Sequence, residues 1–195
     1  MEDTASSLLV GASPDGLICY PDGTVEALEV KNHCPFVTTS RSWGKRFTPK
    51  SSPKHTYCIR DMPFDNPTVP PVYIPQLMME MFCVGVECQS AVMVRQTATS
   101  GAAVLRIYRN DEWIDEMLYW LNKFQADYVE QEQDIPPPTN FFWNDPNPEI
   151  STRYEKFVKW TKQLCDTVEV LDIIKHRDIQ RVMTASENHT SLFLD

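Results

Sequence analysis

The feature that most constrains this fold is the stretch Tyr20-Pro-Asp-Gly-Thr24, which lies between two strand-like runs. Proline presets φ at the first turn position, and aspartate followed by glycine suits the next two, because glycine takes positive φ without steric cost. This order is typical of a three-residue hairpin loop with a glycine bulge, which sets Tyr20 opposite Thr24. A two-residue Asp-Gly loop would shift the register by one residue, but proline is awkward in that turn.

The bulged loop determines which side chains meet further along the hairpin. Counting outward from the loop, Asp15 falls opposite Glu29, and directly opposed residues share a face of the sheet. Lys31 lies two residues beyond Glu29 and faces the same way, since side chains alternate along a strand. Leu28 and Val30 are expected to point to the other side, into the core.

Two carboxylates and an ammonium at one end of a hairpin are suited to metal chemistry. Carboxylates a few ångströms apart repel each other unless a cation lies between them, and oxygen ligands suit Mg²⁺ or Mn²⁺. A nearby lysine can orient a water or stabilise charge that develops on a phosphate. The pattern therefore predicts metal-assisted hydrolysis of a phosphodiester. The alternative is an ordinary surface hairpin with solvated charges, which is the more common reading of an isolated E-x-K.

These residues also carry a resemblance to a known family. Ser13-Pro-Asp-Gly16 followed by Glu29-Val-Lys31 resembles the P-D…(D/E)-x-K motif of the PD-(D/E)XK nucleases. More narrowly, it is similar to the YqaJ-type viral recombinase and lambda-exonuclease family, in which S-P-D-G is followed by E-(V/I)-K-C-P. Here Asn32-His33 separates Lys31 from Cys34-Pro35, so the second motif is interrupted by two residues.

A third motif of that family is a helix with the pattern Y-x-x-Q-(L/I)-x-x-x-M, which is matched by Tyr73, Gln76, Leu77 and Met81. The resemblance implies that Asp15 and Glu29 ligate the metal directly and that the backbone carbonyl of Val30 is a third ligand. It implies that Lys31 orients the attacking water or stabilises the transition state. Gln76 would hold Lys31 or the nucleophile.

The resemblance implies a Mg²⁺- or Mn²⁺-dependent deoxyribonuclease, an exonuclease of recombination or repair that acts on linear duplex DNA. Some relatives form rings around DNA, so a homo-oligomer is compatible with it. The family's first helix has no counterpart before the run at residues 8–11, and we divide the chain into a nuclease-like core (1–134), a proline-rich strap (135–150) and a helical extension (151–195). The rival interpretation is a catalytically inactive nucleic-acid-binding or assembly module that retains the fold.

The expected fold class is α/β in the mixed α+β sense, with a restriction-endonuclease-like core in which helices flank a central mixed sheet. Alternating and β-branched runs predict five strands, at Leu8–Gly11, Leu17–Tyr20, Thr24–Lys31, Ser90–Thr97 and Ala102–Tyr108. Apolar spacing of three and four predicts three helices, at Ile74–Val84, Asp111–Glu132 and Tyr154–Val182.

Charge is distributed unevenly along this acidic chain. The net charge of −9 argues against bulk, non-specific binding of nucleic acid. Residues 36–72 nevertheless form a local basic loop beside the expected site, and its candidate phosphate-binding cations are Arg41, Lys45, Arg46 and Lys50. The loop is interpreted either as a phosphate-binding segment or as ordinary solvated surface.

The cysteines indicate the redox compartment of the protein and raise the alternative of a zinc site. Six scattered cysteines without a C-x-x-C pair predict reduced thiols and an intracellular protein, with nucleus, cytoplasm and virus association undistinguished. The sequence has no long apolar run, so no membrane partner is expected. A zinc site is the weaker alternative, and its ligands would be His55, Cys58, Cys83 and Cys88.

Overall fold

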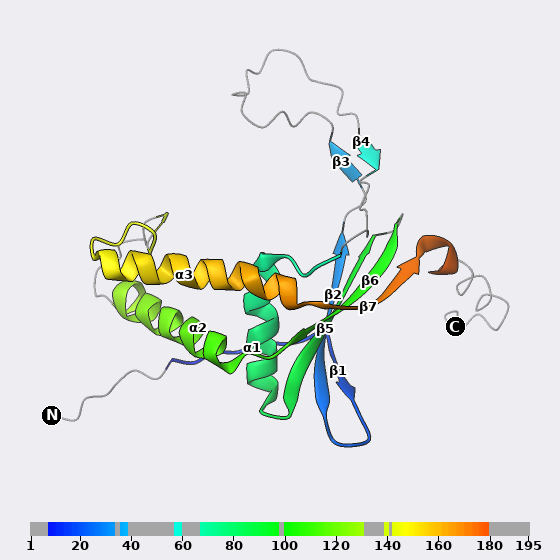
Figure 1. The fold of residues 1–195 in the computed structure, drawn as a ribbon, viewed down its shortest axis with the longest axis horizontal. Helices are drawn as coiled ribbons and strands as arrows, with labels where there is room; N and C mark the ends of the chain where they lie inside the picture. The colour runs from blue at the N-terminus through cyan, green and yellow to red at the C-terminus, as the bar shows by residue number, and fades with distance from the viewer. Residues whose placement is uncertain are drawn as a thin grey trace, which may run out of the picture. The chain divides into compact units, whose positions relative to one another are not determined.

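The computed structural model describes residues 8–33, 36–38, 57–59, 67–97, 100–130, 139–140 and 142–179. Five strands form one sheet in the order β1-β2-β5-β6-β7 (Figure 1). They are β1 (Gly16–Cys19), β2 (Val25–His33), β5 (Cys88–Thr97), β6 (Gly101–Tyr108) and β7 (Glu169–Lys175). A separate two-stranded sheet pairs β3 (Phe36–Thr38) with β4 (Tyr57–Ile59).

Three long α-helices accompany the sheet within the described residues. They are α1 (Ile74–Val84), α2 (Asp111–Phe124) and α3 (Pro148–Leu164). Short helical segments adjoin them: the 3₁₀ turns η1 (Pro71–Tyr73) and η3 (Cys165–Thr167), and the π-helical segment η2 (Gln125–Val129). The protein is therefore of mixed α+β class, with a five-stranded mixed sheet flanked by helices, as the sequence predicts. None of the helices in the described ranges has the length and apolar character needed to span a bilayer.

The sheet contains both strand orientations. β1 and β2 pair antiparallel. Between β2 and β5, Glu26 contacts Ser90 and Asn32 contacts Gln96, so the same offset of 64 residues recurs along the two strands. A constant difference in residue number means that two neighbouring strands run parallel. The parallel connection from β2 to β5 passes through α1, as such crossovers usually do.

The chain forms two compact units. The first contains residues 1–29, 68–93 and 106–169, and the second contains residues 30–67, 94–105 and 170–195. Four strands, β2, β5, β6 and β7, each contribute residues to both units, because the unit boundaries fall within these strands. The helices α1, α2 and α3 belong to the first unit.

The core of the first unit forms between α1 and one face of its strands. α1 begins with Pro75 in its first turn, where a missing N–H costs nothing, and ends at Gly85, whose φ is +130°. Its apolar stripe is completely buried, and so are several small or apolar strand residues of the same unit: Ile74, Leu77, Met78 and Met81 on the helix, and Ala27, Ala91 and Met93 on the strands.

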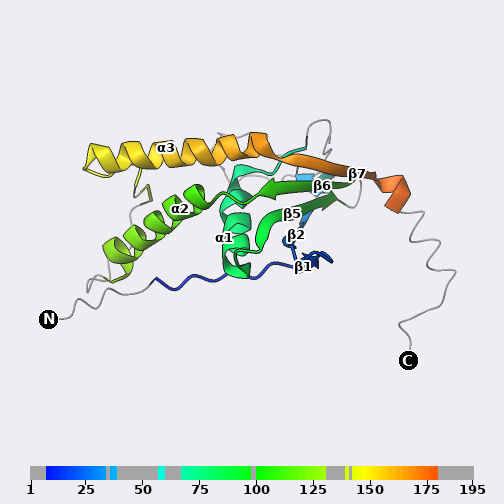
Figure 2. The same ribbon diagram turned by 60° about the horizontal axis from the view of Figure 1, so that its bottom comes forward.

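α2 and α3 pack against each other through aromatic side chains, and they lie side by side in both ribbon views (Figures 1 and 2). Trp113 of α2 stacks on Phe157 of α3 with ring centroids 5.0 Å apart, and its Nε1 donates to Thr161 Oγ1 at 3.1 Å. Trp120 packs against Phe142 and Tyr154 with centroid distances of 4.8 and 4.9 Å. The C-terminal helix therefore packs within the first unit.

Most predicted elements are present, but three predictions need correction. Leu8–Gly11 is not a strand, and the Leu9 side chain is 92% exposed. The helix from Asp111 is α-helical to Phe124 and continues as a π-helical segment to Val129, while residues 131–132 lie outside the described residues. The predicted helix Tyr154–Val182 is confirmed to Leu164, but Glu169–Lys175 forms the strand β7.

β7 belongs to the second unit from Val170 onward, where it runs close to the turn that starts β6. Gly101 in that turn has a φ of +103°, and a Cβ at this position would lie 2.1 Å from the carbonyl oxygen of Ile174. A side chain at residue 101 is therefore excluded on two grounds, backbone conformation and space. The glycine permits the β6 backbone to approach the end of β7.

Candidate functional site

The hairpin loop has the geometry predicted from its sequence. The Tyr20 amide donates to the Thr24 carbonyl oxygen at 3.0 Å, and the Gly23 amide donates to the Tyr20 carbonyl oxygen at 3.0 Å. Gly23 adopts a φ of +88°. Asp22 Oδ1 accepts from the Thr24 amide at 3.0 Å and from its hydroxyl at 2.7 Å, so the aspartate fixes the loop from within. The bulged three-residue loop is confirmed.

The β1–β2 register follows from this loop. Gly16 pairs with Leu28 and Cys19 pairs with Val25, so paired residue numbers always sum to 44. Continuing the register by one residue places Asp15 opposite Glu29, as predicted. Asp15 is exposed at the residue before β1, whereas Glu29 is 4% exposed. The hairpin thus sets one accessible and one buried carboxylate across from each other.

Gln76 joins this site from α1. Its Nε2 donates to Glu29 Oε1 at 2.7 Å and to Glu80 Oε1 at 2.8 Å. Because Gln76 and Glu80 are four residues apart, they share one face of α1. Glu80 is 1% exposed and was not among the predicted site residues. The amide of Gln76 therefore connects the buried acid of β2 to a second buried acid on the helix.

Lys31 and Val30 also lie on β2. Glu29 is the last residue of this strand in the first unit, and Val30 and Lys31 belong to the second unit. The position of Lys31 relative to Glu29 is therefore given only along β2. Strand alternation puts the Lys31 side chain on the same side of β2 as Glu29, and both Val30 and Lys31 are half-buried.

One expectation about the faces of β2 is wrong. Leu28 and Val30 were expected to fill the core, but both are half-buried, whereas Ala27 and Glu29 are buried. The reason is that α1 covers the face that carries Glu29, as the Gln76–Glu29 hydrogen bond shows. The proposed acidic site thus lies on the helix-covered side of the hairpin.

The donors present suit magnesium better than zinc. The described part of the chain contains no group of three or more His, Cys, Asp or Glu side chains able to hold a metal ion. Mg²⁺ keeps several waters and binds through one or two carboxylates together with substrate phosphates, whereas structural zinc needs four protein ligands. The opposed carboxylates Asp15 and Glu29 supply the number of protein ligands that a Mg²⁺ site uses, whereas two ligands are too few for structural zinc.

The zinc alternative gains no support from the described cysteines. Cys83 is exposed, while Cys88 is buried and its Sγ donates to the Ser90 carbonyl oxygen at 3.6 Å. Burial raises the pKa of the Cys88 thiol, which disfavours the thiolate that zinc requires. His55 lies outside the described residues, as do the basic-loop residues Arg41, Lys45, Arg46 and Lys50.

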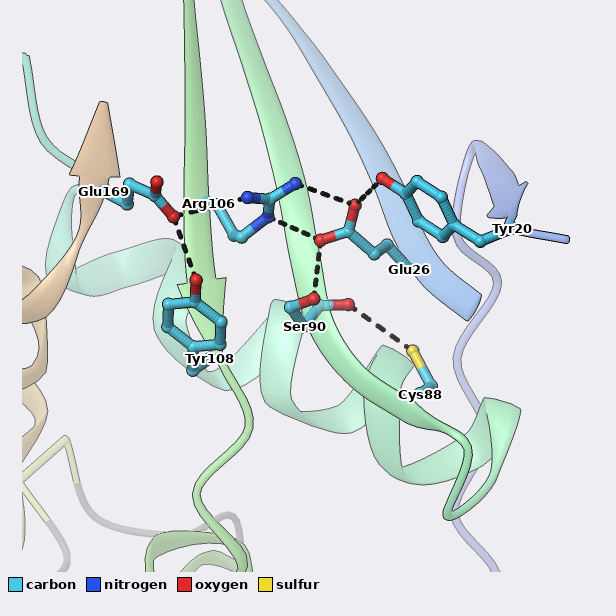
Figure 3. Close-up of polar contacts among 7 residues, drawn as sticks. All are labelled: Tyr20, Glu26, Cys88, Ser90, Arg106, Tyr108 and Glu169. Carbon is cyan, nitrogen blue, oxygen red and sulfur yellow. Dashed lines mark hydrogen bonds and ion pairs between the residues drawn. The ribbon is translucent and has the colours of Figure 1, made fainter. Parts of the chain in front are cut away.

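A second buried acid of β2, Glu26, faces the opposite side of the sheet (Figure 3). Its Oε1 accepts from Arg106 Nε at 2.6 Å and from Ser90 Oγ at 2.5 Å, and its Oε2 accepts from Arg106 Nη2 at 3.2 Å and from the Tyr20 hydroxyl. Arg106 Nη1 donates to Glu169 Oε2 at 3.3 Å, and the Tyr108 hydroxyl donates to the same oxygen at 3.0 Å.

The charges of this Glu26 network stabilise one another. Burial acts to raise the pKa of Glu26, but hydrogen bonds from Arg106, Ser90 and Tyr20 outweigh it, so the pKa lies below its ordinary value of 4.5. The hydrogen bond to Glu26 raises the pKa of the Arg106 guanidinium. The same carboxylate raises the pKa of the Tyr20 hydroxyl above 10.0. Glu26 is therefore a buried, ionised acid with a fixed set of donors.

The Glu26 network was not predicted, although the sequence contains a signal for it. Glu26 interrupts the apolar run of β2, and Arg106 interrupts the apolar run Ala102–Ile107 of β6. Opposite charges within two apolar strands indicate a buried pair, because a lone buried charge is very costly. Which strands become neighbours is a tertiary property, so the pairing itself could not be predicted.

Comparison of the chain with family models, with curated proteins and with solved structures gives no match.

Proposed function

We propose that this protein is a metal-dependent deoxyribonuclease of the PD-(D/E)XK type. The observation that carries the proposal is the β1–β2 register, which sets Asp15 opposite Glu29 on the side where Gln76 binds Glu29. An arrangement of this kind, at the end of a hairpin with a lysine two residues on, is suited to phosphodiester hydrolysis.

Each residue of the site has a distinct role in this proposal. Asp15 and Glu29 would hold the ion together with the backbone carbonyl of Val30. A bound Mg²⁺ or Mn²⁺ would offset the charge of the two carboxylates and of a DNA phosphate. The Gln76 amide keeps the Glu29 carboxylate in one orientation by its 2.7 Å hydrogen bond. Lys31 would orient the attacking water and stabilise negative charge on the phosphate in the transition state.

The test is cleavage of linear duplex DNA in Mg²⁺ or Mn²⁺, with release of nucleotides from the ends as the sign of an exonuclease. Lys31→Ala should reduce the rate by about 10²–10³-fold or more, because it removes a positive charge at the reacting phosphate. Lys159→Ala, at an exposed position of α3, is the matched control and should cleave at the wild-type rate. Equal activity in Lys31→Ala would contradict the assignment.

The basic loop would hold the DNA backbone beside this site. Neutralising Arg41, Lys45, Arg46 and Lys50 together should weaken DNA binding at low salt. When the logarithm of the affinity is plotted against the logarithm of the salt concentration, the slope should also become less steep, by about one unit for each DNA phosphate that the loop no longer neutralises. Affinity titrations at several salt concentrations measure this slope. An unchanged slope would mean that the loop is solvated surface.

The second candidate is a nucleic-acid-binding or assembly module without catalysis. It is favoured by the small number of acids at the site, since the described residues include no cluster of three potential metal ligands. DNA binding without cleavage in either metal, unaffected by Lys31→Ala, would identify this module.

A further inference from the structure

The two buried glutamates of β2, Glu26 and Glu29, are linked through the position of this strand. Glu26 and Glu29 are three residues apart on one strand, so their side chains lie on opposite faces of the sheet. Glu29 is bound by Gln76 on the helix-covered face, whereas Glu26 is bound by Tyr20, Ser90 and Arg106 on the other face (Figure 3). Any shift of β2 that releases one acid therefore displaces the other.

The bond between Tyr20 and Glu26 depends on register. Tyr20 lies opposite Thr24, and Glu26 lies opposite Ile18, so Tyr20 and Glu26 are diagonal neighbours on one face. A shift of one residue turns Glu26 to the face away from Tyr20. The same shift moves Glu29 away from Asp15. The hydrogen bond and the carboxylate pair thus occur together or not at all.

Burial alone specifies this register weakly. β1 has four residues, and those on the face of the metal pair are exposed: Leu17 is 51% exposed, and Cys19 is exposed as well. A strand with little buried surface is prone to slip, because both faces are nearly equivalent in water. Specific polar bonds between buried groups are a known means of fixing register. The buried Glu26 on the next strand supplies a polar bond of this kind to Tyr20, which is 39% exposed.

We propose that Glu26 is a positioning residue for the metal pair. The loop selects the register that sets Asp15 opposite Glu29, and the hydrogen bond from Tyr20 to Glu26 stabilises β1 in that register against a slip. The bonds of Glu26 to Arg106 and Ser90 anchor β2 to β6 and β5. The metal-positioning part of this inference rests on the proposed function, whereas the register part stands on the hairpin geometry alone.

The register can be read by disulfide trapping, because Cys19 lies directly opposite Val25. Directly opposed residues that do not exchange backbone hydrogen bonds are about 4.5 Å apart at Cα, which a disulfide can span. Val25→Cys should therefore form a 19–25 disulfide on mild oxidation. Ile18→Cys with Ala27→Cys should not form an 18–27 disulfide in the observed register, since residues 18 and 27 face opposite sides, whereas the slip to a two-residue Asp-Gly loop would set them opposite each other. Mass spectrometry of peptides identifies each bond.

The expected result is a change in the ratio of the two products. Adding Glu26→Gln to each cysteine variant should lower the 19–25 yield several-fold and raise the 18–27 yield. Tyr20→Phe, which removes a single hydroxyl, is the milder variant and should change the ratio in the same direction even if Glu26→Gln fails to fold. Tyr108→Phe, whose hydroxyl binds Glu169, is the matched control and should leave the ratio unchanged. Unchanged ratios in both test variants would overturn the proposal.

Mn²⁺ binding, followed by electron paramagnetic resonance without DNA, connects the register to the site. Tyr20→Phe and Glu26→Gln should each weaken Mn²⁺ binding about tenfold or more, while Tyr108→Phe should bind as the wild type does. Wild-type affinity in a variant whose disulfide ratio has changed would overturn the positioning role. A wild-type protein that binds no Mn²⁺ would instead refute the proposed function and the positioning role with it. The disulfide ratios would still decide the register part.

Discussion

The two faces of β2 provide different hydrogen-bond partners for a buried glutamate. Glu26 is 5% exposed and accepts hydrogen bonds from a guanidinium and two hydroxyls, whereas Glu29 is 4% exposed and accepts a hydrogen bond from the neutral amide of Gln76. That amide also donates to a further acid, Glu80. Equal burial therefore does not imply an equal role. The cation that binds Glu26 belongs to the protein, whereas the proposed function requires an added cation on the Glu29 face.

The largest expected effect comes from removing the cation of the Glu26 face. Arg106→Met leaves Glu26 buried without its guanidinium and should lower the free energy of unfolding by about 3 kcal/mol, at the low end for a broken buried pair because Arg106 is 24% exposed. Chemical denaturation measures the loss.

The matched control for this variant is Arg153→Met. It breaks the pair between Arg153 and Glu116, in which the arginine side chain is 46% exposed, and should cost about 1 kcal/mol or less. If the two variants lose the same stability, the Glu26 network is not the buried ion pair described above.

A smaller effect is expected on the Glu29 face, where the free energy of unfolding should increase when Mg²⁺ binds. With Mg²⁺ at ten times its Kd, binding to the native state adds about 1.4 kcal/mol to the free energy of unfolding. Glu29→Gln should abolish this gain, because it removes a carboxylate ligand, whereas Tyr108→Phe should keep it. Thermal melts with and without Mg²⁺ measure the difference. A melting temperature that does not respond to Mg²⁺ or Mn²⁺ in the wild type would weigh against the site.

The smallest expected effect is the pH dependence of the stability that ionised Glu26 contributes. The pKa of Glu26 is lowered in the folded state, so the unfolded chain binds the proton more readily between the two pKa values. The stability from ionised Glu26 is complete above the ordinary pKa of 4.5 and is lost as the pH falls through the lowered value. Glu26→Gln should remove this part of the acid dependence. Denaturation curves between neutral and acidic pH that are parallel for wild type and variant would contradict it.

Local sequence determined a large part of this molecule. The Pro-Asp-Gly loop fixed the hairpin, because its φ preferences and the Asp22–Thr24 bonds act within five residues. The register, and with it the opposition of Asp15 to Glu29, follows from that loop by counting. The helix Ile74–Val84 was predicted to the residue, since proline marks its first turn and glycine its end. The sequence placed Gln76 on this helix, but its hydrogen bond to Glu29 was not predicted, since the resemblance implied that Gln76 holds Lys31 or the nucleophile.

Tertiary structure decided the rest. The segment Glu169–Lys175 continues the apolar spacing of α3, but its run of Val, Leu and Ile suits a strand once an edge is available, and β6 supplies that edge. The partners of Glu26 lie 64 and 80 residues away, at Ser90 and Arg106, and no local rule brings them together. Turn chemistry acts over a few residues and can be predicted from sequence, whereas strand neighbours and buried ion pairs depend on which distant segments exclude water from one another.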